Sequence, residues 1–244
     1  MKIDANGLYY KDLNEKIYQA VVSGKREIVL ENVNGQRYIG GGLRGDVKVV
    51  INGVPGNDLA SFMDGPTIIV KSNGQDGIGN TMNAGRVVVY GDAGDIIGYS
   101  MRGGRIYIKG DVGYRVGIHM KSYKGSYPVV IIGGCARDFL GEYMAGGLLI
   151  ILGLNRGDDL PIVGNYVGTG MHGGLIYIRG ELEDYQLGKE VGIEEPSSED
   201  LEQLEGYLEE YCNYFGLNVE DVQQKPFLKL YPRSHRPYGR LYAY

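Results

Sequence analysis

Six of the seven methionines in this chain mark the same position of one internal repeat. They are Met63, Met82, Met101, Met120, Met144 and Met171. The first four lie nineteen residues apart, and the last two follow after steps of twenty-four and twenty-seven. A repeat of this length is typical of a solenoid, in which each repeat stacks on the next because none can bury its apolar face alone.

The repeat carries glycines at fixed places. Asp or Asn, then Gly, then Met, then Gly follow one another at three-residue steps in residues 76–85, 95–104, 138–147 and 165–174. The 41 glycines are therefore periodic, as expected where a chain turns a corner with positive φ. This argues against a disordered, glycine-rich segment.

Each repeat contains one strand. Residues 105–109 alternate polar and apolar side chains between two glycine corners, which is typical of a strand with one buried face. Nineteen residues are too few for a strand–helix unit and fit one turn of a parallel β-helix. Strands in such a rod stack about 4.8 Å apart. The sequence therefore predicts an all-β, single-stranded parallel β-helix of about seven coils over residues 35–182.

Equivalent residues should line up in rows along the rod. The methionines are expected to form an internal ladder, with Leu43 in the methionine position of the first, degenerate repeat. A second row consists of Asn57, Asp76, Asp95, Asp138 and Asn165. Its side chains are expected to cap turns by accepting hydrogen bonds from nearby backbone N–H groups.

The flanking segments differ from the repeats. Residues 1–34 form a predicted cap segment with a helix over 10–22, where apolar residues recur at helical spacing. Residues 183–244 form an extension whose helix begins near Ser197 and ends near Gly216. We expect both helices to cover the end coils, which would otherwise expose unpaired strand edges.

Charge and composition exclude several classes. A net charge of −5 and a pI near 5.3 argue against a nucleic-acid or anionic membrane surface. No apolar run of about 18 residues and no signal-peptide pattern occurs, so a cytoplasmic protein without a membrane span is expected. Cys135 and Cys212 lack metal-ligand spacing and are expected to be packing residues.

Catalytic chemistry finds no support in the residue pattern. His119 and His172 flank their methionines on opposite sides, so they should lie in different rows, solvated, and cannot form one ligand set. The acidic row recurs in nearly every repeat, whereas a catalytic carboxylate pair would occur once. The glycine-rich stretches lack the strand–loop–helix context of a dinucleotide site. We therefore predict no catalytic, cofactor-binding or metal-binding residue.

Two sets of residues are candidates for a partner interface. Arg86, Arg105 and Lys124 each lie four residues after a methionine, so they should form a basic stripe on the rod. The stripe would be either a solvated face or a docking site for an acidic partner.

The second set lies in the basic, tyrosine-rich tail, at Arg233, Arg236, Tyr238, Arg240 and Tyr242. Arginine and tyrosine are typical of a protein–protein anchor. The alternative is that the tail packs on the acidic segment before it, where 181–224 contain fourteen acids and one lysine.

A family resemblance lies in residues 3–34, in Gly35–Leu43 and in the coil motifs of 77–82 and 98–104. Together they resemble the Gly-x-Gly-x-Gly domain of glutamate synthase, a right-handed β-helix at the C-terminus of the large subunit. The resemblance covers about residues 1–182. The same domain recurs in one subunit of formylmethanofuran dehydrogenase and in one subunit of N-methylglutamate synthase.

The resemblance implies a non-catalytic subunit of a split enzyme in glutamate biosynthesis. Its partners would be a glutamine amidotransferase subunit and an FMN-binding glutamate synthase subunit, with FMN and iron–sulfur on those partners and no cofactor on this chain. The chain has no N-terminal cysteine nucleophile, since Lys2 follows Met1. N-methylglutamate synthase and formylmethanofuran dehydrogenase remain alternatives, as do an independent β-helix enzyme and an end-to-end homo-oligomer.

Overall fold

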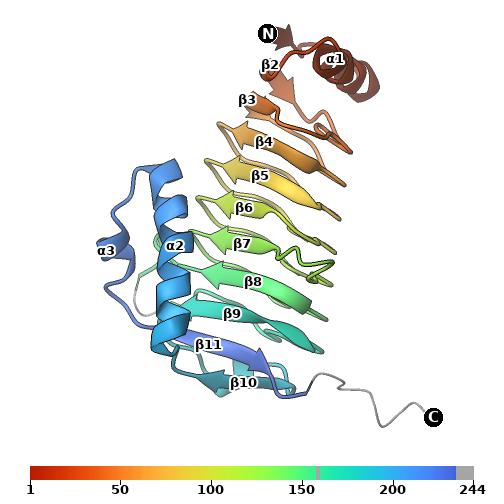
Figure 1. Cartoon of the computed structure of the whole chain (residues 1–244). Helices are drawn as coiled ribbons and strands as arrows, with labels where there is room; N and C mark the ends of the chain where they lie inside the picture. The colour runs from red at the N-terminus through yellow and green to blue at the C-terminus, as the bar shows by residue number, and fades with distance from the viewer. Residues whose placement is uncertain (158–159, 235–244) are drawn as a thin grey trace, which may run out of the picture.

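The computed structural model describes residues 1–157 and 160–234, and its strands form one sheet in the order β1-β2-β3-β4-β5-β6-β7-β8-β9-β11-β10. Strands β2 to β8 each pair in parallel with the equivalent strand one coil later, so that β9 is the last strand of the parallel series. The result is a parallel β-solenoid of about 6 turns, close to the seven coils expected (Figure 1). The predicted fold class is confirmed.

The strands are β1 Lys2–Asp4, β2 Glu27–Asn34, β3 Lys48–Val54, β4 Asp64–Val70, β5 Ala84–Val89, β6 Arg105–Ile108, β7 Val129–Ile132, β8 Ala145–Ile151, β9 Gly173–Arg179, β10 Val191–Glu194 and β11 Phe227–Pro232. The helices are α1 Tyr10–Val22, a 3-10 turn at Asp184–Gln186, α2 Ser198–Phe215 and α3 Val219–Val222. The sheet thus begins before the predicted boundary at residue 35 and continues beyond residue 182.

The interior of the solenoid is a continuous apolar core. All six repeat methionines are fully buried there, and Leu43 takes the equivalent place in the first repeat. From Met82 onward, the residue after each methionine donates its N–H to the preceding methionine's carbonyl, as Arg102 does to Met82 at 2.8 Å; Asp64, after Met63, donates to Leu43 O. The predicted internal ladder is confirmed.

A corner of unusual backbone precedes each methionine. Counting back from the methionine, the fifth, third and first residues have positive φ, as in Gly77, Gly79 and Thr81 before Met82 (φ 72°, 72° and 54°). Two overlapping turns result, with Asn80 N–H donating to Gly77 O at 3.1 Å and Met82 N–H to Gly79 O at 3.0 Å.

The middle of these three positions requires a small residue. A Cβ at Gly79 would collide with Ile106, which comes from the strand of the next coil. The fifth and first positions before the methionine accept larger side chains, among them Ile96 and Tyr143. Side chains placed there are held in a region that non-glycine residues rarely adopt.

Two ladders of acidic and amide side chains connect the coils. In the first ladder, Asp76 Oδ1 accepts from Asp95 N at 2.9 Å and Asp95 Oδ1 accepts from Tyr114 N at 2.9 Å. The second runs from Asn73 through Asp92 and Asp111 to the N–H of Cys135, with bonds of 3.0, 2.8 and 2.8 Å. The acceptor role expected of Asp76 and Asp95 is confirmed, but the donor lies in the next coil rather than in the same turn.

The two ends of the solenoid are closed differently. At the N-terminal end, Leu13, Ile17 and Ala20 of α1 are buried against the core, as expected. At the C-terminal end, β11 pairs antiparallel with β9, and β10 pairs antiparallel with β11. The expectation that α2 caps this end is wrong, because α2 runs along the stack, across the strands (Figure 1).

Candidate partner interface

Helix α2 covers the outer face of the sheet. Five of its side chains are buried against outward-facing side chains of β5 to β9 and form a second apolar core with them. From α2 these are Leu204, Leu208, Tyr211, Cys212 and Phe215, and from the strands Val88, Tyr107, Ile131, Ile150 and Tyr177. The middle strands of the solenoid are therefore buried on both faces.

The predicted basic stripe lies against this helix. Arg86 and Arg105 occupy the same register on β5 and β6, as expected. Arg86 Nε donates to Glu210 Oε1 at 2.5 Å, and Arg105 Nη1 forms an ion pair with Glu210 Oε2. The Arg105 guanidinium also lies 5.3 Å from the ring centre of Tyr207. The stripe is thus neither fully solvated nor waiting for an acidic partner, since the acidic group is on α2 of the same chain.

Lys124 does not continue the stripe, and that expectation is wrong. Arg105 pairs with Val129 on β7, five residues beyond Lys124. The extra residues form an exposed hairpin at 121–127, in which Tyr123 N donates to Ser126 O at 3.1 Å and Ser126 N to Tyr123 O at 2.9 Å. Lys124 and Gly125 at its tip have φ of 50° and 81°.

A second ion-pair cluster fixes the start of α2. Asp200 accepts hydrogen bonds from Tyr177 Oη and Lys229 Nζ, each at 2.8 Å, and from Ser197 N at 2.9 Å. Burial raises the pKa of the Asp200 carboxyl, but the bonds from Lys229 and Ser197 outweigh burial and hold that pKa well below its usual range. The hydrogen bond to Asp200 raises the pKa of Lys229.

This cluster concerns the predicted tail interface. Lys229 lies on β11 and pairs with Asp200 of α2. The beginning of the basic C-terminal segment therefore contacts the acidic helix, which is the alternative in which this segment packs on its own chain. Arg233 lies just after β11 and is exposed. Arg236, Tyr238, Arg240 and Tyr242 lie outside the described residues.

Burial raises the pKa of both cysteine thiols and of the Tyr211 hydroxyl. Cys212 lies in the second core, and burial raises the pKa of its thiol. Burial, and then the nearby Asp111, raise the pKa of Cys135, which lines a cleft of about 360 Å³ with Arg137 and Arg156. Burial also raises the pKa of Tyr211, which donates to Ile108 O at 3.2 Å. Both thiols are free and buried, consistent with the expected packing role.

A partly exposed aromatic surface, which the sequence did not predict, lies on the corner of the solenoid before the methionines. We call it the aromatic corner and define it by Tyr99, Arg115, His119, Phe139, Tyr143 and Tyr166. The Phe139 and Tyr166 rings are stacked, with centroids 4.9 Å apart and planes at 13°. The His119 and Tyr143 rings are likewise stacked, at 5.4 Å and 10°.

Polar and edge contacts connect the rest of the aromatic corner. Arg115 lies 4.9 Å from the ring centre of Phe139, and its Nε donates to Glu142 Oε2 at 2.9 Å. The ring of Tyr99 meets that of His119 at 6.1 Å in an edge-to-face arrangement. His119 is exposed and lies in a different row from His172, as expected.

Five residues of the aromatic corner have left-handed backbone. Their φ values are 56° at Arg115, 54° at His119, 63° at Phe139, 53° at Tyr143 and 61° at Tyr166. A side chain in this region costs about 1 kcal/mol or more relative to glycine. These are the fifth and first residues before the methionines. The earlier coils have Asp58, Gly77, Thr81 and Ser100 at these positions, but also Phe62 and Ile96, so the sequence signal was weak.

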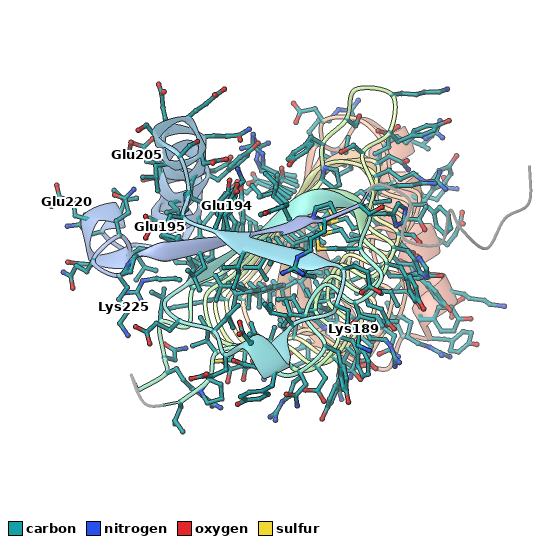
Figure 2. The ribbon with its side chains drawn as sticks, turned by 90° about the horizontal axis from the view of Figure 1, so that it is seen from below. Lys189, Glu194, Glu195, Glu205, Glu220 and Lys225 are labelled. Atoms are coloured by element: carbon teal, nitrogen blue, oxygen red, sulfur yellow. The ribbon has the colours of Figure 1, made fainter. Side chains whose placement is uncertain are left out.

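Helices α2 and α3 carry eight acidic residues. Viewed along the stack, Glu205 on α2 and Glu220 on α3 lie on the side that these helices form, whereas Lys189 lies away from them (Figure 2). Within residues 1–157 and 160–234, no group of three or more His, Cys, Asp or Glu could hold a metal ion. None of the helices described is both long and apolar enough to cross a bilayer.

Comparison with known proteins points to one family. The model of the GXGXG motif family matches residues 15–233. An uncharacterized protein of Methanocaldococcus jannaschii is 52% identical over 250 residues, which cover 99% of this chain and 95% of that protein.

Among solved structures, a chain of the formyltransferase/hydrolase complex from Methylorubrum extorquens, determined in complex with methylofuran, superposes with a TM-score of 0.63. The match covers 84% of this chain and 72% of that chain, at 19% sequence identity. At that identity the likeness shows a shared fold.

Proposed function

Because the chain belongs to the GXGXG motif family, we propose that it is a structural, non-catalytic subunit of a split glutamate-synthase-type complex. In this proposal it holds a glutamine amidotransferase subunit and an FMN-binding synthase subunit in a fixed relation. Ammonia released by the first can then reach the second without loss to solvent.

The corner backbone is the observation that carries the proposal. Its three left-handed positions are spaced two residues apart, which is the spacing of the three glycines in the family's motif. At Tyr166, Gly168 and Gly170 the last two positions are glycine, and the first is a tyrosine with the same backbone conformation. Each coil bonds to the next at these positions; Gly168 N, for example, donates to Leu140 O at 2.7 Å. A rod bonded in this way along both its sheet and its corner keeps two attached sites at a constant separation.

The chemistry of the side chains supports a scaffold. The carboxylates of the two ladders accept backbone hydrogen bonds between coils, and both thiols have raised pKa values. The proposal therefore assigns FMN and iron–sulfur to the partner subunits, with catalysis on those chains. This chain supplies rigidity and surface.

A second candidate is a subunit of a complex that handles formyl groups on a methanofuran-type carrier. The structural similarity to a chain of the formyltransferase/hydrolase complex favours it. N-methylglutamate synthase is a further alternative within the same family resemblance. All three functions share the scaffold role and differ in the partners.

The test is mild affinity capture of the chain from its own cells, followed by identification of its partners by mass spectrometry. A flavoprotein together with a glutaminase-type chain is the expected result. Formyltransferase or hydrolase subunits would instead establish the second candidate. The isolated chain is expected to show no flavin absorbance and no glutamine hydrolysis. A bound flavin or glutamine hydrolysis in a pure sample would contradict the scaffold role.

A further inference from the structure

The aromatic corner continues into the exposed hairpin of residues 121–127, which we call the basic hairpin. His119 on the corner and Lys121 in the hairpin flank the buried Met120, so both project from the same part of the coil. Arg102, one coil earlier, lies 5.7 Å from the ring centre of Tyr123 in the hairpin. One surface therefore extends over neighbouring coils.

The charge of this surface differs from that of the whole chain. Arg102, Arg115, Lys121 and Lys124 supply positive charge, and Glu142 is paired with Arg115. The chain as a whole carries a formal charge of −5, and α2 and α3 carry eight acidic residues, Glu205 and Glu220 among them (Figure 2). A basic, aromatic surface on an acidic protein is complementary to carboxylates on another molecule.

The composition of the surface is that of an interface rather than of a solvated face. Exposed Tyr123 lies beside Arg102 and Lys124, and Arg115 lies beside Phe139. Aromatic residues with arginine are enriched where proteins bind one another. The stacked pairs Phe139–Tyr166 and His119–Tyr143 are held by left-handed turns that a glycine would satisfy without strain. Backbone strain of this kind is typical of functional positions.

We propose that the aromatic corner and the basic hairpin form one docking surface for an acidic segment of a protein partner. The inference rests on the proposed function in one respect, namely that the chain works within a complex. It does not depend on which complex that is. Lys121 and Lys124 would pair with the partner's carboxylates, and the stacked rings would cover apolar surface beside them.

Zero-length cross-linking of the native complex tests the docking surface. A water-soluble carbodiimide joins a lysine amine to a carboxylate in direct contact with it, so the product reports both the position and the acidity of the partner. We expect Lys121 or Lys124 to be joined to Asp or Glu of a partner chain. Lys11 and Lys16, exposed on α1 at the far end of the solenoid, are the matched controls and should remain unlinked.

Each outcome bears separately on the two proposals. Cross-links from the hairpin to any partner support the docking surface, and the identity of that partner decides the proposed function. Lysines of the hairpin that stay as reactive in the complex as in the isolated chain would overturn the docking surface while leaving the scaffold role intact. Cross-links from the hairpin to α2 of a second copy of this chain would overturn the proposal that the partner is a different protein. Recovery of the chain without any partner would overturn it as well.

Variants give an independent measurement. Tyr143→Gly and Tyr166→Gly remove two rings at positions where glycine fits the backbone, so the fold should be retained. Combined with Lys121→Glu and Lys124→Glu, they should lower partner recovery at least about tenfold, whereas Lys11→Glu with Lys16→Glu should not. Circular dichroism checks that each variant is folded. Unchanged recovery with the four substitutions would contradict the proposal.

Discussion

Glu210 of α2 binds Arg86 and Arg105, which stand in the same register on β5 and β6, one coil apart. One carboxylate thereby fixes the helix to two coils. Two arginines stacked on neighbouring strands would repel each other, and the shared acid removes that repulsion. The acidic extension is consequently an integral part of the solenoid.

Removing this carboxylate should loosen α2. We expect Glu210→Gln to lower the free energy of unfolding by about 1 kcal/mol, since the arginines are partly exposed and solvent screens the pairs. Hydrogen exchange of α2 amides should become faster than in the wild type. Glu209→Gln, an exposed neighbour on the same helix, is the control and should change neither quantity. Equal effects of both substitutions would show that Glu210 does not anchor the helix.

The Asp200 cluster predicts a pH dependence. Because the pKa of Asp200 is lower in the folded chain than in an unfolded one, its stabilising contribution is present above about pH 4 and is lost as the pH falls toward the folded pKa. The pKa of Lys229 is raised, so its contribution is lost only as the pH rises above about 10.5.

Urea unfolding at pH 7 and pH 3 measures the acidic part of this dependence. The loss of stability between the two pH values should be smaller in Asp200→Asn than in the wild type, and unchanged in the exposed neighbour Glu199→Gln. An identical loss in Asp200→Asn would mean that the cluster contributes nothing to acid sensitivity.

The methionine ladder predicts a cavity effect. Met101 is fully buried between the coils of Met82 and Met120, so Met101→Ala should lower the free energy of unfolding by about 2–5 kcal/mol. Met101→Leu nearly conserves volume and should cost less than about 1.5 kcal/mol. Denaturant titration of both variants separates them, and equal small losses would indicate that the row is loosely packed.

Two glycine-to-alanine substitutions should change the free energy of unfolding in opposite directions. A Cβ at Gly113 would collide with Asp95 Oδ1, which accepts from Tyr114 N, so Gly113→Ala should destabilise by about 1–3 kcal/mol. Gly206 lies in α2 with no atom near its missing Cβ, and Gly206→Ala should stabilise by about 0.5–1 kcal/mol. Thermal unfolding compares the two, and a neutral Gly113→Ala would show that the ladder is not packed as described.

The sequence predicted the features that repeat. Spacing alone placed Met63 to Met171 inside the solenoid and Leu43 in the first coil, because a stacked fold converts a linear period into a spatial row. The acceptor role of Asp76 and Asp95 was also predictable, but their donors were not. Turn residues usually bond within their own turn, and only the stacking of one coil on the next brings the more distant N–H into reach.

Features that break the period were harder to predict. Lys124 was assigned by counting from its methionine, and the insertion that forms the hairpin shifts the following strand to Val129. The position of α2 had a signal in the apolar runs of β7 and β8, since strands buried on both faces do not alternate. The aromatic corner repeats a backbone conformation rather than a residue type, so glycine spacing alone conceals it.

The two ladders have a direction. Each acceptor belongs to the earlier coil and each donor to the later one, as with Asp92 and the N–H of Asp111 nineteen residues on. During synthesis, therefore, the backbone N–H groups of the two ladders leave the ribosome after the side chains that accept from them. The molecule can be built in the order in which it is translated, with each finished turn serving as the template for the next.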